Sequence, residues 1–273
     1  MTPVRIEVVH RTHFRFAGPS SLSIHQCRLA PQPGQGQRIV GWEIRAPGRP
    51  RDWVDGYGNT VRVFTVTGAH EEVEIVAQGV FESADGASAY LSHGDPAPLP
   101  PLYWLRNHGL ARHDRSIRDF VADLKPRAAA EEERVPLLHD LMRRIAGRVK
   151  YTVGATDVEV GAVEALNRGA GVCQDHAHLF AASCRALGIP ARYVSGYMRV
   201  HDELRGPASH AWAEAYVPAL GFVGFDPANG ICPTGEYLKL AVGLDYREAA
   251  PVTGRRLGGG SAAMTVEVQV RQV

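Results

Sequence analysis

The sequence predicts an α+β protein, with an all-β amino-terminal module followed by helices packed on an antiparallel sheet. Three observations predict this class. Segments before residue 93 alternate between apolar and polar residues or are rich in β-branched residues, as strands are. Stretches after residue 101 repeat their apolar residues every three or four positions, as helices do. Alternation then returns between residues 191 and 226, and 273 residues suffice for one large domain or two modest ones.

The amino-terminal module is predicted to contain strands at residues 4–16, 37–45, 60–67 and 73–81, joined by glycine-rich turns. Residues 94–101 are rich in proline, which fixes φ and lacks an N–H donor, so they are predicted to form a linker. We therefore predict an all-β module at 1–93, a linker at 94–101, a core at 102–250 and a tail at 251–273. The tail alternates cleanly at 264–270 and is expected to return to the module as another strand.

Helical periodicity predicts helices at residues 116–124, 135–145 and from 173 onward. The last of these carries one apolar stripe, made of Cys173, Ala177, Phe180, Cys184 and Leu187. The residues Gly188 and Pro190 then terminate it, because glycine tolerates positive φ and proline prevents the helix from resuming. A buried helix of about fifteen residues is therefore expected to begin at Cys173.

Two strands after this helix, at 191–198 and 209–217, show period two. The second strand has small residues on one face, which suits close packing against a helix, and His210 on the other. Residues 221–226 are predicted to pair with it as a hairpin. Pairing of Val217 with Gly221 makes Asp226 the diagonal neighbour of His210, whereas pairing of Val217 with Phe222 sends the two to opposite faces.

The most informative residue is Cys173, which lies where a glycine-rich loop turns into the predicted helix. Unpaired N–H groups and the positive end of the helix dipole favour a thiolate at such a position. Downstream, His210 and Asp226 supply an imidazole and a carboxylate. Cysteine, histidine and aspartate in this order are the parts of a thiol catalytic triad.

Four stretches of the sequence resemble the bacterial transglutaminase-like superfamily, and the resemblance extends nearly from end to end. They are VCQDHAHLF at 172–180, CRALGIPARYVSGY at 184–197, SHAWAE at 209–214 and GFDP at 224–227. Weaker likenesses are CRLAP at 27–31, the Gly-Asn pair at 58–59 and GLDY at 243–246. Two positions differ from the common family pattern, since Ala228 stands where Thr is usual and Leu244 where Arg is usual.

The resemblance implies a papain-related fold, in which 102–250 is a transglutaminase-like catalytic core. It also implies that Cys173 is the nucleophile, His210 the base and then the acid, and Asp226 the residue that orients the imidazole. The expected chemistry is acyl transfer from a peptide or glutamine-type amide through a Cys thioester, mainly with hydrolysis. Alternatives are a true protein-glutamine transglutaminase and, in another class, a catalytically inactive peptide-binding module.

The candidate substrate-binding residues are Tyr151, Gln174, Asp175 and Trp212. We expect a peptide or protein substrate and neither a cofactor nor a metal. A zinc site would need ligands such as Cys173, His176, Cys184 and His210, whose spacing matches neither a paired-cysteine site nor an i, i+4 histidine pair. Asp175 has a second interpretation, as a first-turn carboxylate that complements the helix dipole.

Composition excludes other classes of function. Lysine and arginine number 30 against 29 acidic residues, which leaves a net charge of +1, so no strong field attracts nucleic acid or an anionic membrane. The start of the chain lacks an apolar signal core, and the four cysteines have no disulfide-like spacing. We therefore expect a cytoplasmic protein with reduced thiols, while the oligomeric state is left open.

Overall fold

The structure, a computed structural model, describes residues 4–32, 37–83, 99–199 and 209–273. Residues 94–98 of the predicted linker therefore lie outside the described residues. The strands are β1 (Val4–Cys27), β2 (Gln37–Arg45), β3 (Arg49–Val54), β4 (Thr60–Ser83), β5 (Lys150–Tyr151), β6 (Ala170–Gly171), β7 (Ala191–Met198), β8 (Ser209–Val217), β9 (Gly221–Phe225), β10 (Tyr237–Gly243), β11 (Val252–Gly258) and β12 (Ala262–Gln272).

The helices are short apart from two in the core, α3 and α5. The α-helices are α1 (Arg115–Phe120), α2 (Lys125–Ala128), α3 (Arg134–Arg148), α4 (Ala162–Arg168), α5 (Cys173–Ala186) and α6 (Tyr246–Ala249), and the 3-10 helices are η1 (Pro101–Leu105), η2 (Gly109–Ala111) and η3 (Ala122–Leu124). No helix in the described ranges is both long and apolar enough to span a membrane. The chain is thus mixed helix and sheet, as predicted.

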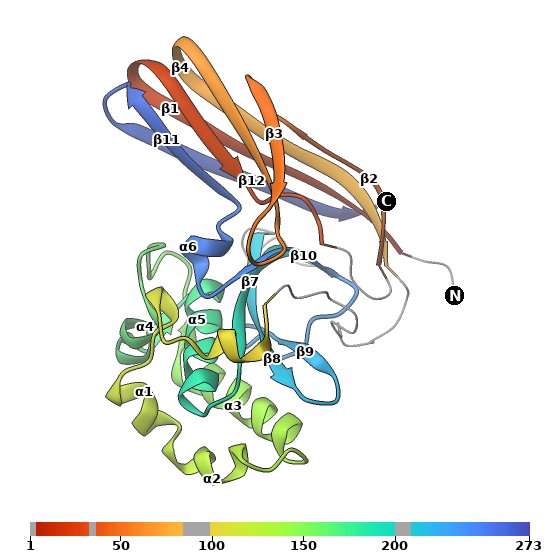
Figure 1. Ribbon diagram of the computed structural model, residues 1–273, viewed down its shortest axis with the longest axis vertical. Helices are drawn as coiled ribbons and strands as arrows, with labels where there is room; N and C mark the ends of the chain where they lie inside the picture. The colour runs from red at the N-terminus through yellow and green to blue at the C-terminus, as the bar shows by residue number, and fades with distance from the viewer. Residues whose placement is uncertain (1–3, 33–36, 84–98, 200–208) are drawn as a thin grey trace.

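One large antiparallel sheet lies at one end of the molecule, and Figure 1 shows its long strands lying above the helical region. Within the described residues its order is β11-β1-β4-β2, with β12 also paired to β1 and β3 to β4. The prediction of separate strands at 60–67 and 73–81 is wrong, because both lie in β4. The glycine between them, Gly68, has φ +89°, and the pairing with β1 shifts there, so it forms an irregularity within a strand and not a turn.

The inner face of this sheet packs on the second sheet. Alternate residues of β1, such as Ile6 and Val8, are fully buried in a cluster that also contains Tyr197 from β7 and Leu238 from β10. The Tyr197 hydroxyl and the His10 ring are hydrogen-bonded at 2.9 Å. The amino-terminal strands thus share an apolar core with the sheet that carries the candidate site.

A buried amide reinforces the contact between the two sheets. Asn59 follows the β3–β4 turn and has no exposed surface. Its side chain donates to the Val242 carbonyl and accepts from the Val242 N–H, each at 2.8 Å, as a neighbouring strand would. It also bonds Asp55 and Gln32, so its amide is fully used.

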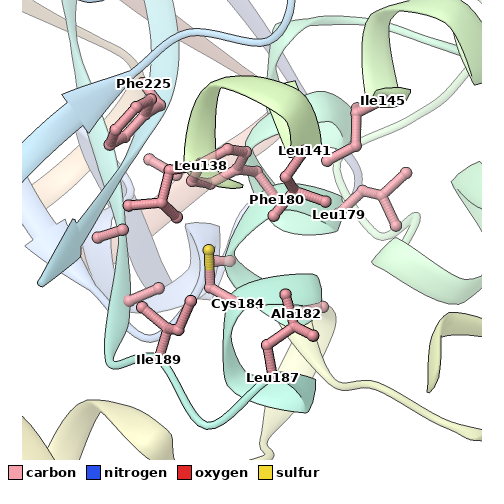
Figure 2. Close-up of a cluster of buried hydrophobic side chains, with 14 of the residues drawn as sticks. Leu138, Leu141, Ile145, Leu179, Phe180, Ala182, Cys184, Leu187, Ile189 and Phe225 are labelled. Carbon is pink, nitrogen blue, oxygen red and sulfur yellow. The ribbon is translucent and has the colours of Figure 1, made fainter. Parts of the chain in front are cut away.

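The second sheet is antiparallel, with the order β10-β7-β8-β9, and α5 packs against β7 and β8. The small face of β8 meets this helix as predicted, since Ala213 and Ala215 are fully buried in the same cluster as Phe180. Figure 2 shows Leu138, Leu141 and Ile145 of α3 on one side of that cluster and Phe225 of β9 on another. The rings of Phe180 and Phe225 stack with their centroids 5.3 Å apart.

The predicted helix boundaries hold for α5 and α3 and fail for the first helix. Gly188 has φ +77° just after α5, which matches the predicted stop signal. The predicted helix at 116–124 is instead divided, because Val121 leaves helical geometry between α1 and η3. The next turn of η3 buries Leu124 in the same cluster as Ile117 of α1.

The guanidinium of Arg185, on α5, bonds four separate segments of the core. It is 4% exposed and donates to the carbonyl oxygens of Trp104, Ala111, Ala191 and Leu244, at distances of 2.8–3.2 Å. These acceptors belong to η1, η2, β7 and the segment that follows β10. One side chain therefore satisfies carbonyl groups that would otherwise be buried without donors.

We expect Arg185→Met to lower the free energy of unfolding by about 3 kcal/mol, because several buried carbonyls lose their donor at once. Urea denaturation followed by circular dichroism measures this. Arg118→Met, at an exposed position of α1, is the control and is expected to change stability by less than about 0.5 kcal/mol. Equal stability of the two variants would contradict the bracing role of Arg185.

Candidate active site

Cys173 is the first residue of α5 and its side chain is partly exposed. The preceding residue, Val172, is extended, and its carbonyl accepts from the N–H groups of Asp175 and His176. The N–H groups of Cys173 and Gln174 come before the first intrahelical donor, so they are available to a ligand at the helix start. The nucleophile candidate therefore lies where the sequence predicted it.

The helix start is held by Asp175, whose Oδ2 accepts from the Val172 N–H at 2.7 Å and from the Thr156 hydroxyl at 2.5 Å. The carboxylate is 1% exposed, and burial raises its pKa. Asp175 thus caps the backbone before Cys173, which is the second of its two interpretations. Its neighbour Gln174 is 9% exposed and donates to the Val158 carbonyl at 3.0 Å, which fastens the loop 152–161 to the helix.

A short parallel pair of strands brings Tyr151 to the same place. β5 pairs with β6, and Tyr151 lies opposite Gly171, two residues before the nucleophile candidate. Tyr151 is 39% exposed. Burial raises the pKa of its hydroxyl, and the negative charges of Cys173 and Asp226 raise it further. Tyr151 is therefore close enough to Cys173 and Asp226 to interact electrostatically with both.

The β8–β9 hairpin has the register that the triad requires. Val217 pairs with Gly221, and Gly221 has φ +77° at the turn. His210 and Asp226 consequently lie on the same side of the sheet, with His210 Nε2 and Asp226 Oδ2 2.7 Å apart. Of the two pairings that the sequence left open, the one that the triad requires is present, and the pairing of Val217 with Phe222 does not occur.

Asp226 is fully buried and receives hydrogen bonds at both oxygens. Oδ2 accepts from His210, from the Tyr237 hydroxyl at 2.8 Å and from the Asn229 amide at 2.7 Å. Oδ1 accepts from the backbone N–H groups of Ala228 and Asn229. Burial opposes the charged carboxylate, but the positive charge of His210 and these donors hold the pKa of Asp226 below its usual value.

The His210 imidazole is 7% exposed and lies between two negative groups. Burial by itself lowers its pKa, but the charges of Asp226 and Cys173, and hydrogen bonds to both, outweigh burial and raise the pKa to about 10. A carboxylate only accepts, so Nε2 carries the proton directed at Asp226, and Nδ1 is the nitrogen left for the sulfur. The three residues therefore form a thiol, imidazole and carboxylate chain.

Trp212 takes a different place from the one that substrate binding would need. Its side chain is 1% exposed, and its ring stacks on His210 and meets Tyr237 edge to face at 5.5 Å. Glu214, two residues along β8, is fully buried and forms ion pairs with Arg192 and Lys239. Both side chains are thus buried and engaged with protein groups, so they are not placed to contact a substrate.

Two residues at the site were missed by sequence analysis, namely Tyr237 and Asn229. Asn229 follows Asp226 by three residues, and asparagine is a common turn residue, so the sequence carried a signal for the turn but none for the contact. Tyr237 is on β10 and reaches Asp226 only because β10 pairs with β7 across the sheet. No local pattern marks such a contact.

Two of the residues considered as zinc ligands, His176 and Cys184, are engaged elsewhere. Both ring nitrogens of His176 are 2.9 Å from backbone carbonyls, those of Val172 and Val149. Cys184 is fully buried in the apolar core, and burial raises the pKa of its thiol. Over the described ranges, no group of three or more His, Cys, Asp or Glu residues is arranged to hold a metal ion.

Comparison with known proteins agrees with this geometry. Residues 120–227, which contain Cys173, His210 and Asp226, match the model of the transglutaminase-like superfamily. Residues 6–82 match the bacterial transglutaminase-like N-terminal region. The chain belongs to the transglutaminase-like superfamily. The resemblance seen in the sequence motifs is therefore confirmed.

Relatives match over almost the whole chain. “Uncharacterized protein ML0607” of Mycobacterium leprae (strain TN) is 28% identical over 98% of this chain and 99% of its own. “Uncharacterized protein Rv2569c” of Mycobacterium tuberculosis (strain ATCC 25618 / H37Rv) is 30% identical over 92% of this chain and 87% of its own. The solved structure “Putative Cysteine Protease from Cytophaga hutchinsonii” has a TM-score of 0.75 at 20% identity, covering 100% of this chain and 92% of that one. That likeness establishes the shared transglutaminase-like fold.

The raised pKa of His210 makes the stability of the protein depend on pH. A group whose folded pKa is raised stabilises the fold fully below its unfolded pKa of 6.5, and this stabilisation is lost as pH rises through about 10. Let the stability difference be the free energy of unfolding of the wild type minus that of His210→Gln. We expect this difference to decrease by a few kcal/mol as the pH rises from 6.5 to about 10, on the order that such a pKa shift implies. Urea denaturation at both ends of the range measures it.

A matched variant tests the cause. Asp226→Asn removes the charge that raises the pKa of His210 most, so the same comparison made in an Asp226→Asn background is expected to lose most of its pH dependence. A stability difference that stays constant with pH in the wild-type background would contradict the buried ion pair.

Proposed function

We propose that this protein is a thiol-dependent acyl-transfer enzyme that acts on a peptide or glutamine-type amide, mainly as a hydrolase. One observation carries the proposal: the buried His210 ring joins Asp226 to the partly exposed Cys173 at the start of a helix. Such an arrangement supplies a nucleophile, a proton carrier and a group that fixes the orientation of the imidazole. Membership of the transglutaminase-like superfamily supports the same chemistry.

In the proposed first step, the Cys173 sulfur attacks the amide carbon and forms a C–S bond, while the carbonyl electron pair moves to oxygen. The free N–H of Cys173 is placed to donate to this oxyanion. We propose the Tyr151 hydroxyl as the second donor. Tyr151 is partly exposed, and the charge of Cys173 raises the pKa of its hydroxyl. Both donors would then act on charge that develops in the transition state.

Collapse of this intermediate breaks the C–N bond, and the imidazolium of His210 gives its proton to the departing amine. A thioester remains on Cys173. His210, now neutral, accepts a proton from water as the water oxygen attacks the thioester carbon. The C–S bond breaks, the acid is released, and the thiolate and imidazolium are restored. Asp226 keeps the ring in one orientation throughout, since donors hold its carboxylate on both oxygens.

We favour hydrolysis over transamidation because the two side chains considered for amine binding, Trp212 and Glu214, are buried. Transfer to an amine requires a pocket that binds the amine and excludes water. Trp212 is 1% exposed, and Glu214 is fully buried against Arg192 and Lys239. Neither offers a face to a lysine-like acceptor. A true transglutaminase is therefore the less supported activity. The contact between His210 and Asp226 makes an inactive peptide-binding module less supported as well.

Selective reactivity of Cys173 is the first expected outcome. Iodoacetamide at neutral pH should alkylate Cys173 faster than the other three cysteines. Burial raises the pKa of Cys27 to about 12 and also raises the pKa of Cys184 and Cys232, which suppresses their thiolates. Timed labelling, read by peptide mass spectrometry, compares the four rates.

Two variants provide the controls for this labelling. Cys173→Ala should keep the thermal unfolding midpoint within a few degrees, on the order expected for a small change at a partly exposed site, and should abolish turnover. Cys232→Ala removes another partly exposed thiol and should leave turnover intact. Equal alkylation rates at all four cysteines in the wild type would contradict the activated nucleophile.

The choice of acyl acceptor is testable separately. With a glutamine peptide and a labelled primary amine at millimolar concentration, ammonia release should exceed amine incorporation, because Trp212 and Glu214 are buried and cannot bind the amine. Both products should disappear in Cys173→Ala. Incorporation that equals ammonia release would reverse the order and identify a true transglutaminase.

A further inference from the structure

A cavity of about 900 Å³ has a lining separate from the candidate active site. Its wall combines η2 and the residues before it, α4 with the loop that leads into it, and Arg247 of α6. None of Cys173, His210 and Asp226 lines it. Its size is within the range of about 300–1,000 Å³ that is usual for small-molecule pockets.

Arginines outnumber glutamates by one on the wall of this cavity. Three arginines, Arg112, Arg168 and Arg247, line it together with two glutamates, Glu159 and Glu164. The glutamates are each paired, Glu164 with Arg168 and Glu159 with Arg247. The formal charge of these five side chains is therefore +1, and the surplus cation is Arg112.

Arg112 has no hydrogen bond or ion pair to any residue that the structure describes, and the same holds for two other lining side chains, His108 and Asn167. A guanidinium carries five N–H donors in a planar fork that matches carboxylate and phosphate oxygens. The imidazole and the amide line the same cavity and add further donors. All three side chains are exposed, so a ligand can reach their donors.

The two ion pairs at the wall are easily shared with a ligand. The side chains of Glu159 and Arg247 are 64% and 57% exposed, and those of Glu164 and Arg168 are 52% and 46% exposed. Exposed pairs of this kind contribute only about 0–1 kcal/mol, so turning one guanidinium toward an incoming anion costs little. Arg168 and Arg247 are therefore available to an anionic ligand in addition to Arg112.

The floor of the cavity is already formed. The Leu110 N–H donates to Asp245 Oδ2 at 2.7 Å, and the next carbonyl, that of Ala111, accepts from Arg185. Gly161 lies against Leu110 so closely that a Cβ there would be 2.9 Å from the Leu110 carbonyl oxygen. A rigid floor lowers the ordering cost of binding.

We propose that this cavity binds a small multivalent anion that bears carboxylate or phosphate groups, with Arg112 as the principal contact. The site is independent of the proposed acyl-transfer chemistry, since no triad residue lines it. Its wall does share the loop 152–161 with the catalytic helix. Glu159 faces Arg247 on the cavity side, while Thr156 and Val158 bond the first turn of α5.

Isothermal titration of the full chain with pyrophosphate and with citrate, at constant ionic strength set by chloride, tests the proposal. We expect binding at one site per chain by at least one of the two. Arg112→Ala should weaken it about 10- to 100-fold, the loss of charge-assisted hydrogen bonds expressed as an affinity ratio. Binding of pyrophosphate alone identifies a phosphate ligand, and binding of citrate alone a carboxylate ligand.

Two matched variants make the test specific. Arg115→Ala removes an exposed arginine three residues away that does not line the cavity and should bind as the wild type does. Cys173→Ala should also bind normally, which separates this site from the acyl-transfer site. Binding of neither probe, an equal loss in Arg115→Ala, or a loss in Cys173→Ala would overturn the proposal. Unchanged thermal unfolding of Arg112→Ala establishes that its effect is local.

Discussion

Close packing of α5 on the alanine face of β8 is the constraint on which the rest of the site depends. Ala213 and Ala215 are fully buried against the helix, and residues this small let helix and sheet approach closely. The helix carries Cys173 at its first residue, and the strand carries His210 near its start on the opposite face from the alanines. A larger side chain on the alanine face would move the helix away and separate the sulfur from the imidazole.

Charge in and around the candidate site is tolerated because each buried charge has a specific set of partners. Asp226 has donors on both oxygens, Arg185 donates to four carbonyls, and Glu214 lies between Arg192 and Lys239. Removing one partner from such a set leaves a buried charge without compensation. The resulting loss of stability is larger than the stability that the intact pair contributes. The same feature that holds the His210 ring in place therefore makes the site sensitive to single substitutions.

The amino-terminal sheet contributes to the site indirectly, through the strands that it covers. Tyr197 of β7 and Leu238 of β10 belong to its apolar core, and the Asn59 amide bonds Val242 on β10. β10 is also the strand that presents Tyr237 to Asp226. Packing of the amino-terminal module thus restrains the strand that completes the hydrogen bonding of the carboxylate.

The sequence by itself determined the local features: the start of α5 at Cys173, its end before Gly188 and the small face of β8. Each follows from short-range periodicity or glycine placement, which act within a few residues. For the hairpin that carries His210 and Asp226 the sequence left two registers open, and the structure has the pairing of Val217 with Gly221. Only the tertiary structure decided the rest. It buried Trp212 beneath His210, made Asp175 a cap for the helix start, and joined two predicted strands into β4. It also brought Tyr237 to Asp226, and it placed Arg112 and Arg247 in the wall of one cavity. These outcomes depend on contacts between segments far apart in the chain. The local sequence around a residue does not indicate which distant residues it will contact.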